Sequence, residues 1–115
     1  RTARVGEERQ NDSIATFDVL PEVRASVGDD IEVVLDGGVR RGLDIVKALA
    51  RGADSVAIGR AYLFGLAAGG FDGVDKALQI LSRDVYLAMG LLGCRTVSEL
   101  RQRAPDLLVE SKRRK

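Results

Sequence analysis

Two short apolar segments, each followed by glycine and then by a helical pattern, constrain the fold of this chain more than any other feature. The first runs from Ile31 to Leu35 and stops at Asp36, and its consecutive apolar residues are typical of a strand buried on both faces. The second runs from Ser55 to Ile58 and stops at Gly59. The sequence between them suits one right-handed crossover, so we expect two neighbouring parallel strands.

Helical periodicity surrounds these strands. Asp18 is expected to cap the first helix and to place Pro21 in its first turn, where a missing N–H costs nothing. The spacing of apolar residues predicts helices over residues 18–28, 42–51, 61–68, 74–92 and 96–100.

The two ends of the chain show neither pattern. The first eight residues lack the apolar pattern of a strand, and residues 102–115 resemble a tail.

Two parallel strands with open edges do not make a stable sheet. A closed (β/α)8 barrel needs roughly 250 residues, whereas this chain has 115. We therefore expect one α/β unit over residues 1–115 that is the C-terminal piece of a (β/α)8 TIM barrel. It would comprise the last two βα units and the C-terminal helices, completed by a missing N-terminal barrel portion, by another chain or by self-association.

Composition excludes several classes of partner. Eighteen Lys and Arg against 17 Asp and Glu leave a net charge of +1, which gives no field to gather nucleic acid. No apolar run approaches the roughly 18 residues of a membrane helix. One cysteine, Cys94, excludes an internal disulfide and fits a reducing cytoplasm, with Cys94 as core filler. We expect no membrane insertion and no metal site.

The turn after the first strand has the composition of an anion-binding loop. It contains Asp36, Gly37, Gly38, Val39 and Arg40 and leads into a helix. Its glycines let backbone N–H groups approach a ligand, while the helix N-terminus and Arg40 favour an anion. From this turn alone, a phosphate site and a turn that merely needs positive φ are equally good interpretations.

The second strand end decides between these interpretations. Gly59 and Arg60 follow that strand directly, and the carboxyl ends of parallel strands meet at one rim, where α/β barrels bind their ligands. Because arginine can hold phosphate through two hydrogen bonds, the two turns together predict a phosphate site at this rim.

The same residues resemble a known family. Residues 35–60 read LDGGVRRGLDIVKALARGADSVAIGR, residues 62–68 read YLFGLAA, and residues 89–100 read MGLLGCRTVSEL. These motifs resemble the last barrel units of FMN-dependent 2-hydroxy acid dehydrogenases and oxidases, a family that includes glycolate oxidase and lactate and mandelate dehydrogenases. The resemblance covers residues 9–101.

The resemblance implies a cofactor and a site. Bound FMN would have its phosphate held by the turn from Asp36 to Arg40 and by Gly59 and Arg60, with Asp36 orienting the loop and the ribityl hydroxyl groups. The resemblance also implies a small 2-hydroxy acid substrate, whose carboxylate Arg9 would bind.

The histidine that takes the substrate's hydroxyl proton in this family has no counterpart here. Its position falls on Gly6, and the chain contains no histidine. Two interpretations follow. The chain is the FMN-phosphate-binding C-terminal part of an oxidoreductase that is inactive in isolation, or it is a non-catalytic half-barrel that binds a phosphorylated ligand or a partner subunit. Whether the chain is itself an enzyme stays open at this point.

Overall fold

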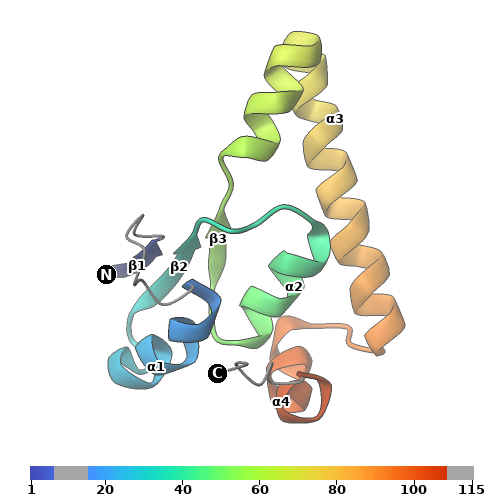
Figure 1. Ribbon diagram of the computed structural model, residues 1–115. Coiled ribbons are helices and arrows are strands. Elements are labelled where there is room, and N and C mark those ends of the chain that lie inside the picture. The colour runs from blue at the N-terminus through green and yellow to red at the C-terminus, as the bar shows by residue number, and fades with distance from the viewer. Residues whose placement is uncertain (7–15, 109–115) are drawn as a thin grey trace, which may run out of the picture.

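A three-stranded parallel sheet organises the computed structural model, which describes residues 1–6 and 16–108. Its strands are β1 (Thr2–Gly6), β2 (Glu32–Asp36) and β3 (Ser55–Ala57), in that spatial order. The helices are α1 (Thr16–Val27), α2 (Gly42–Ala50), α3 (Arg60–Leu92) and α4 (Val97–Leu107). Figure 1 shows α3 projecting away from the sheet as a long hairpin, with α4 below it.

The parallel pairing of β2 and β3 confirms the expected crossover unit. The expectation that the first predicted strand is buried on both faces is met on one face only. Val33 and Leu35 are fully buried, whereas Val34 between them is half-buried. In a closed barrel the face that carries Val34 would look into the barrel interior, and three strands do not enclose it.

The strand β1 contradicts the prediction that the first eight residues contain none. It pairs with β2 so that Val5 lies opposite Leu35, and Val5 is buried in the core. Only Ala3 and Val5 are apolar among its side chains, which is too short an alternation to recognise. The open edge of β2 supplies the hydrogen bonds that make this segment a strand.

The helix α1 begins two residues earlier than predicted, at Thr16. Asp18 is therefore inside the first turn and does not cap the helix, and Pro21 lies within the helix. The carboxylate of Asp18 lies 3.7 Å from the guanidinium of Arg51, so it contributes to packing between α1 and the end of α2. The helix ends before Gly28, whose φ is +69°, as predicted.

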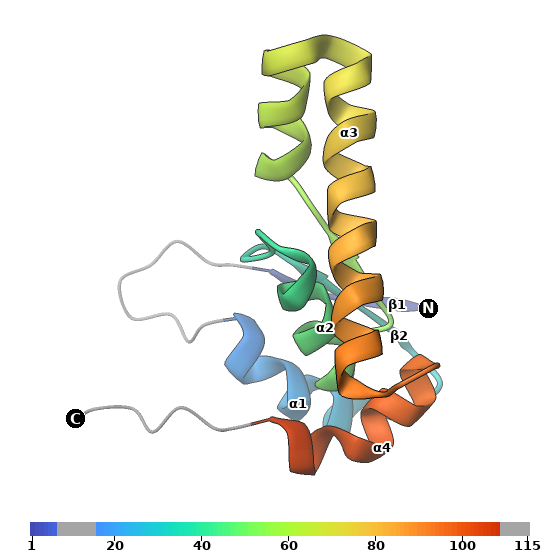
Figure 2. The ribbon, with the colours of Figure 1, turned by 90° about the vertical axis from the view of Figure 1, so that its right-hand side faces the viewer.

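The break predicted between residues 68 and 74 is present. Helical backbone geometry is interrupted at Gly69 and Gly70, which divide α3 into a first arm, Arg60–Ala68, and a second arm, Phe71–Leu92. Figure 2 shows the two arms side by side. Among the described residues, no helix is both long enough and apolar enough to cross a membrane.

The last helix is longer than predicted. Thr96 caps it as expected, accepting a hydrogen bond from the N–H of Glu99 at 3.1 Å, but α4 continues past Leu100 to Leu107. Residues 102–107 are therefore helical and not tail. Burial of Ala104 and packing of Leu107 against the neighbouring helices stabilise the extra turns, and residues 109–115 lie outside the described part.

Two apolar clusters hold these elements together. One lies between the sheet and helices α1 and α2 and is centred on Leu20, Val33 and Leu35. The other joins α2, α3 and α4 around Val46, Leu100 and Cys94, which confirms the cysteine as a core residue. Because α2 contributes to both clusters, it links the sheet to the C-terminal helices.

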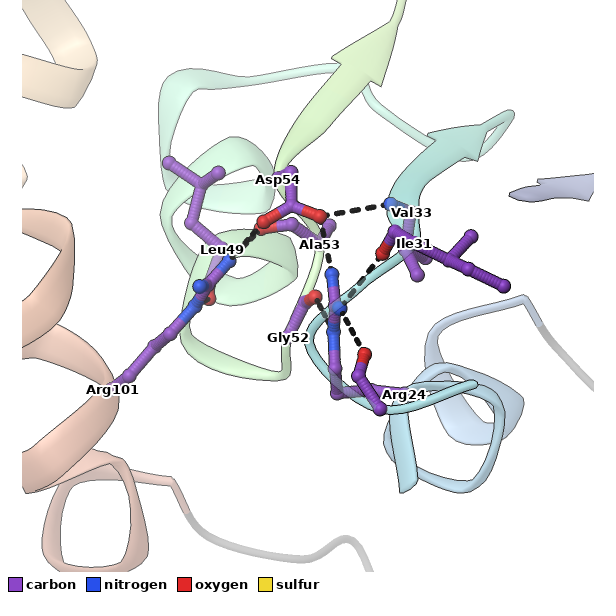
Figure 3. Close-up of polar contacts among 9 residues, drawn as sticks. Arg24, Ile31, Val33, Leu49, Gly52, Ala53, Asp54 and Arg101 are labelled. Carbon is purple, nitrogen blue, oxygen red and sulfur yellow. Dashed lines mark hydrogen bonds and ion pairs between the residues drawn. The ribbon is translucent and has the colours of Figure 1, made fainter. Parts of the chain in front are cut away.

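A network of hydrogen bonds and ion pairs connects four segments at the amino-terminal end of the strands (Figure 3). The carboxylate of Asp54, in the turn before β3, accepts the N–H of Val33 at 2.8 Å. It also pairs with the guanidinium groups of Arg24 in α1 and of Arg101 in α4. Arg24 further donates to the carbonyl of Ile31 at 3.0 Å. One carboxylate thus connects α1, β2, the α2–β3 turn and α4.

The pKa of Asp54 reflects these contacts. Burial acts to raise the pKa of the carboxyl, but hydrogen bonds from Val33, Arg24 and Arg101 and the charge of Arg24 outweigh burial and lower it below the ordinary 3.8. A group whose pKa is lower in the folded state stabilises the fold above its unfolded pKa, and this stabilisation is lost as pH falls through the folded value.

We expect Asp54→Asn to lower the free energy of unfolding by about 1.5–3 kcal/mol at neutral pH, because two arginines lose an anionic partner. The wild-type protein should lose this difference as pH falls below about 4, and the variant should depend less on pH in that range. Urea denaturation at several pH values measures both effects.

The matched control is Asp29→Asn, which removes one exposed carboxylate and should leave the free energy of unfolding within about 0.5 kcal/mol of wild type. Equal stabilities for both variants would contradict a structural role for the Asp54 network.

Candidate functional site

The register of the sheet brings the three strand ends together. Gly6 lies opposite Asp36, and Asp36 lies opposite Ala57. The segments that follow these residues therefore leave the sheet from one rim, its carboxyl end. This confirms that the two glycine- and arginine-containing turns meet at the same rim, where parallel α/β folds carry their ligand sites.

An open pocket of about 330 Å³ lies between the two turns, and both predicted arginines, Arg40 and Arg60, line it. Neither guanidinium group makes a hydrogen bond or ion pair with another residue in the described parts of the chain, and both residues are exposed. Two unpaired guanidinium groups beside one space favour a dianion. The lining residues are Val39, Arg40, Arg60, Ala61 and Phe64.

Phe64 and Ala61 belong to this pocket although the sequence prediction omits them. Phe64 follows Arg60 by four residues on one helix, so the two side chains share a face. That spacing is a usable signal in the sequence. Phe64 is 72% exposed and gives the pocket an apolar wall next to its two positive charges.

The amino end of α2 differs from the expectation that it would attract an anion. The carboxylate of Asp44 accepts the N–H groups of Arg40 and Arg41, each at 3.0 Å. An internal carboxylate thus satisfies these donors and offsets the positive end of the helix. An acidic residue three positions after the helix N-cap is a capping signal, and it could have been recognised in the sequence.

The amino end of α3 is the better place for an anion. Its N-cap residue is Gly59, which provides no side-chain cap, and the first turn contains no acidic residue. Arg60 and Ala61, the first residues of the helix, line the pocket. The helix dipole and the Arg60 guanidinium therefore act on the same space.

The turn after β2 requires its glycines. Gly37 and Gly38 have φ values of +107° and +75°, which side-chain-bearing residues rarely adopt. A Cβ on Gly38 would lie 3.3 Å from the ring of Phe17. Val39 then turns inward and is buried in the sheet core, so the next residue, Arg40, is held at the pocket by a buried neighbour.

Asp36 has a partner that sequence reasoning missed. The Nε of Arg4 in β1 lies 2.9 Å from Oδ2 of Asp36. The carboxylate side chain is 35% exposed and that of Arg4 is 72% exposed. The unrecognised first strand explains the omission, since Arg4 reaches Asp36 only when β1 pairs with β2.

The remaining predicted site residues lie at or beyond the end of β1. Gly6 is the last residue of that strand, at the rim, and Arg9 lies outside the described residues. In the parts of the chain that the structure describes, no group of three Asp, Glu, His or Cys residues could hold a metal ion.

A second pocket of similar size has a different chemistry. It lies between α2, β3 and the second arm of α3, and no charged side chain lines it. A phosphate group would find no counter-charge there. Its lining residues are Ile45, Val56, Ile58, Leu78, Leu81, Ser82 and Val85.

Comparison with known proteins agrees with the rim site. The family model described as FMN-dependent dehydrogenase matches residues 8–106. The L-lactate oxidase of Nostoc sp. is 46% identical over 95 residues, covering 83% of this chain and 26% of that protein. The pre-mycofactocin synthase of Mycobacterium tuberculosis is 54% identical over 86 residues, covering 75% of this chain and 22% of its own length.

Solved structures give the same relationship. A mandelate oxidase variant with a monooxide FMN adduct superposes with a TM-score of 0.82 and 38% identity, over 88% of this chain and 33% of that structure. The chain thus spans about a quarter of the length of the curated relatives it matches and corresponds to a piece of the TIM-barrel fold. FMN is the cofactor of the matched family. This chain belongs to the FMN-dependent dehydrogenase family.

Proposed function

We propose that this chain is the FMN-phosphate-binding C-terminal part of an oxidoreductase that oxidises 2-hydroxy acids to 2-oxo acids, in which FMN, when bound, accepts the hydride. The observation that carries the proposal is the pocket shared by Arg40 and Arg60 at the carboxyl rim of the sheet. Family membership supports it independently.

The residues at the pocket fit a phosphate group. Arg40 and Arg60 would donate charge-assisted hydrogen bonds to the phosphate oxygens. The uncapped start of α3 at Gly59 adds backbone N–H donors. Gly37 and Gly38 leave the backbone of the other turn without side chains, so a ligand can approach it closely.

Asp36 and Arg9 have proposed roles that rest on the family resemblance. Asp36 would orient the turn and the ribityl hydroxyl groups. Its ion pair with Arg4 supports the first part of this role, because it anchors the carboxylate to β1. Arg9 would bind the carboxylate of the substrate, a small 2-hydroxy acid.

Oxidation of a 2-hydroxy acid needs a base that removes the proton of the substrate hydroxyl group. This chain has no imidazole side chain that could be this base. The chain contains no histidine, and the family resemblance puts Gly6, the last residue of β1, at the corresponding position. We propose that the chain alone is inactive for this reason. A non-catalytic half-barrel that binds a phosphorylated ligand or a partner subunit is the second candidate, and the absence of histidine favours it.

The open edges of the sheet indicate that further strands pair with it. Among the described strands, β1 and β3 each pair on one side only, with β2. Open edges of a parallel sheet expose unpaired backbone groups. We propose that the remaining barrel strands or further copies of this chain cover these edges. The single cysteine supports a reducing compartment, the cytoplasm.

Removing either arginine tests the phosphate role. We expect Arg40→Ala and Arg60→Ala each to weaken FMN binding roughly 10- to 100-fold, about 1.5–3 kcal/mol, because each loses a charge-assisted contact. Riboflavin, which lacks the phosphate, should bind the variants and the wild type equally. Titration followed by flavin fluorescence measures both ligands.

The control for these variants is Arg83→Ala, an exposed arginine on the second arm of α3 outside the pocket. It should leave both affinities unchanged. Parallel losses for FMN and riboflavin in the pocket variants would show that the arginines support the fold and do not bind phosphate.

Catalysis by the chain is tested separately. We expect no oxidation of lactate, glycolate or mandelate by the 115-residue chain with added FMN, because a positioned base contributes about 10²- to 10⁴-fold. Anaerobic bleaching of the flavin absorbance is the measurement. Bleaching faster than a protein-free control would show that another group in this chain serves as the base.

The state of the sheet edges is tested by sedimentation velocity. At micromolar concentration we expect the chain to form oligomers, or to unfold with little cooperativity as a monomer, because a small sheet with two open edges is marginal. A compact monomer that unfolds cooperatively in urea would contradict the proposal that the edges need a partner.

A further inference from the structure

The first arm of α3 carries Arg60 but does not rest on the sheet. Figures 1 and 2 show this arm standing beside the second arm, at the far end of the molecule from α1. The main partner of α3 among the described elements is α2. Two residues, Ile58 and Gly59, connect Arg60 to β3. The position of Arg60 relative to Arg40 therefore depends on this short link, on how the arms contact each other and on how the second arm contacts α2.

The two arms meet through a pair of glycines. A Cβ on Gly65 would lie 2.5 Å from the carbonyl oxygen of Gly73 and 3.3 Å from the Cβ of Ala77. A Cβ on Gly73 would likewise collide with the carbonyl of Gly65. The backbones of the two arms thus touch immediately after Phe64, and no side chain fits between them.

A third glycine joins the second arm to the other turn of the pocket. Gly42 is the first residue of α2 and is buried, two positions after Arg40. A Cβ on Gly42 would collide with Asp84 and would lie 2.7 Å from the backbone nitrogen of Val85. The second arm therefore packs directly on the backbone that follows Arg40.

Other glycines of the hairpin have no such constraint. Gly69, Gly70 and Gly90 would each have open space around an added Cβ. The close contacts occur at the positions that connect the segment of Arg40 to the segment of Arg60. They form a continuous backbone path from Gly42 through the second arm to the glycine pair between the arms.

We propose that Gly42, Gly65 and Gly73 are positioning residues that set the separation of Arg40 and Arg60 and so make the pocket selective for a phosphate-bearing ligand. This inference rests on the proposed phosphate function of the pocket. An added methyl group at these contacts pushes the arms, or the second arm and α2, apart, because close-packed backbone has no room to yield. Arg60 then moves away from Arg40.

The test compares FMN with riboflavin in Gly42→Ala, Gly65→Ala and Gly73→Ala. Each variant should bind FMN about tenfold more weakly, similar to a partial loss of one charge-assisted contact, with riboflavin binding unchanged. Gly90→Ala, in open space on the same helix, should bind both flavins as the wild type does. A general loss of structure would weaken both ligands together and would contradict a positioning role.

A double variant isolates the route through Arg60. In an Arg60→Ala background, Gly65→Ala should cause a smaller loss of FMN affinity than in the wild type, because the guanidinium group that it displaces is gone and only the backbone N–H groups at the start of α3 still move. In an Arg40→Ala background, the loss from Gly65→Ala should persist. A loss in the Arg60→Ala background as large as in the wild type would contradict positioning through Arg60.

The outcomes separate this inference from the proposed function. A wild-type protein that binds FMN no better than riboflavin would overturn both. A wild-type preference for FMN that survives all three glycine substitutions would overturn only the positioning role. Gly65 and Gly73 lie outside both apolar clusters, so their variants should keep the wild-type circular dichroism spectrum, and an unfolded Gly65→Ala would also contradict a role limited to positioning.

Discussion

The carboxylate of Asp54 is the interaction on which the rest of this structure depends. It accepts the N–H of Val33 near the start of β2 and pairs with arginines from α1 and α4. Segments that are 30 and 47 residues away in sequence meet at this one group. A small sheet with open edges has little apolar burial to hold it, so a shared anion that joins four segments has a large effect on their arrangement.

The network and the pocket lie at opposite ends of the strands. Asp54 precedes β3 and contacts the beginning of β2, whereas Asp36 and Gly59 lie at or beyond the carboxyl ends of these strands. This division matches the general behaviour of α/β barrels, in which the amino-terminal face stabilises the fold and the carboxyl-terminal face binds ligands. The arginines reflect the same division. Those of the network are paired with a carboxylate, while the guanidinium groups of Arg40 and Arg60 have no ion-pair partner among residues 1–6 and 16–108.

Features that depend on neighbours in sequence could be predicted. Strands ended by glycine, and the break at Gly69 and Gly70, follow from local backbone preferences, and parallel strands put both arginine-bearing turns at one rim. Other features had no local signal. The segment Thr2–Gly6 becomes a strand because β2 offers it an edge, and the last turns of α4 form because they pack on neighbouring helices. The glycine contacts between the arms of α3 are equally invisible, since Gly65 looks no different from Gly90 in the sequence.

The sequence by itself determined the alternating α/β order, the family motifs, the two arginine-bearing turns and the absence of histidine. These properties are written in residue types and in short-range spacing. Only the tertiary structure decided that β1 exists and that Asp54 joins α1 to α4. It also decided which glycines are pressed against another backbone. Such contacts join residues far apart in the chain, and their energy depends on distances that residue spacing does not encode.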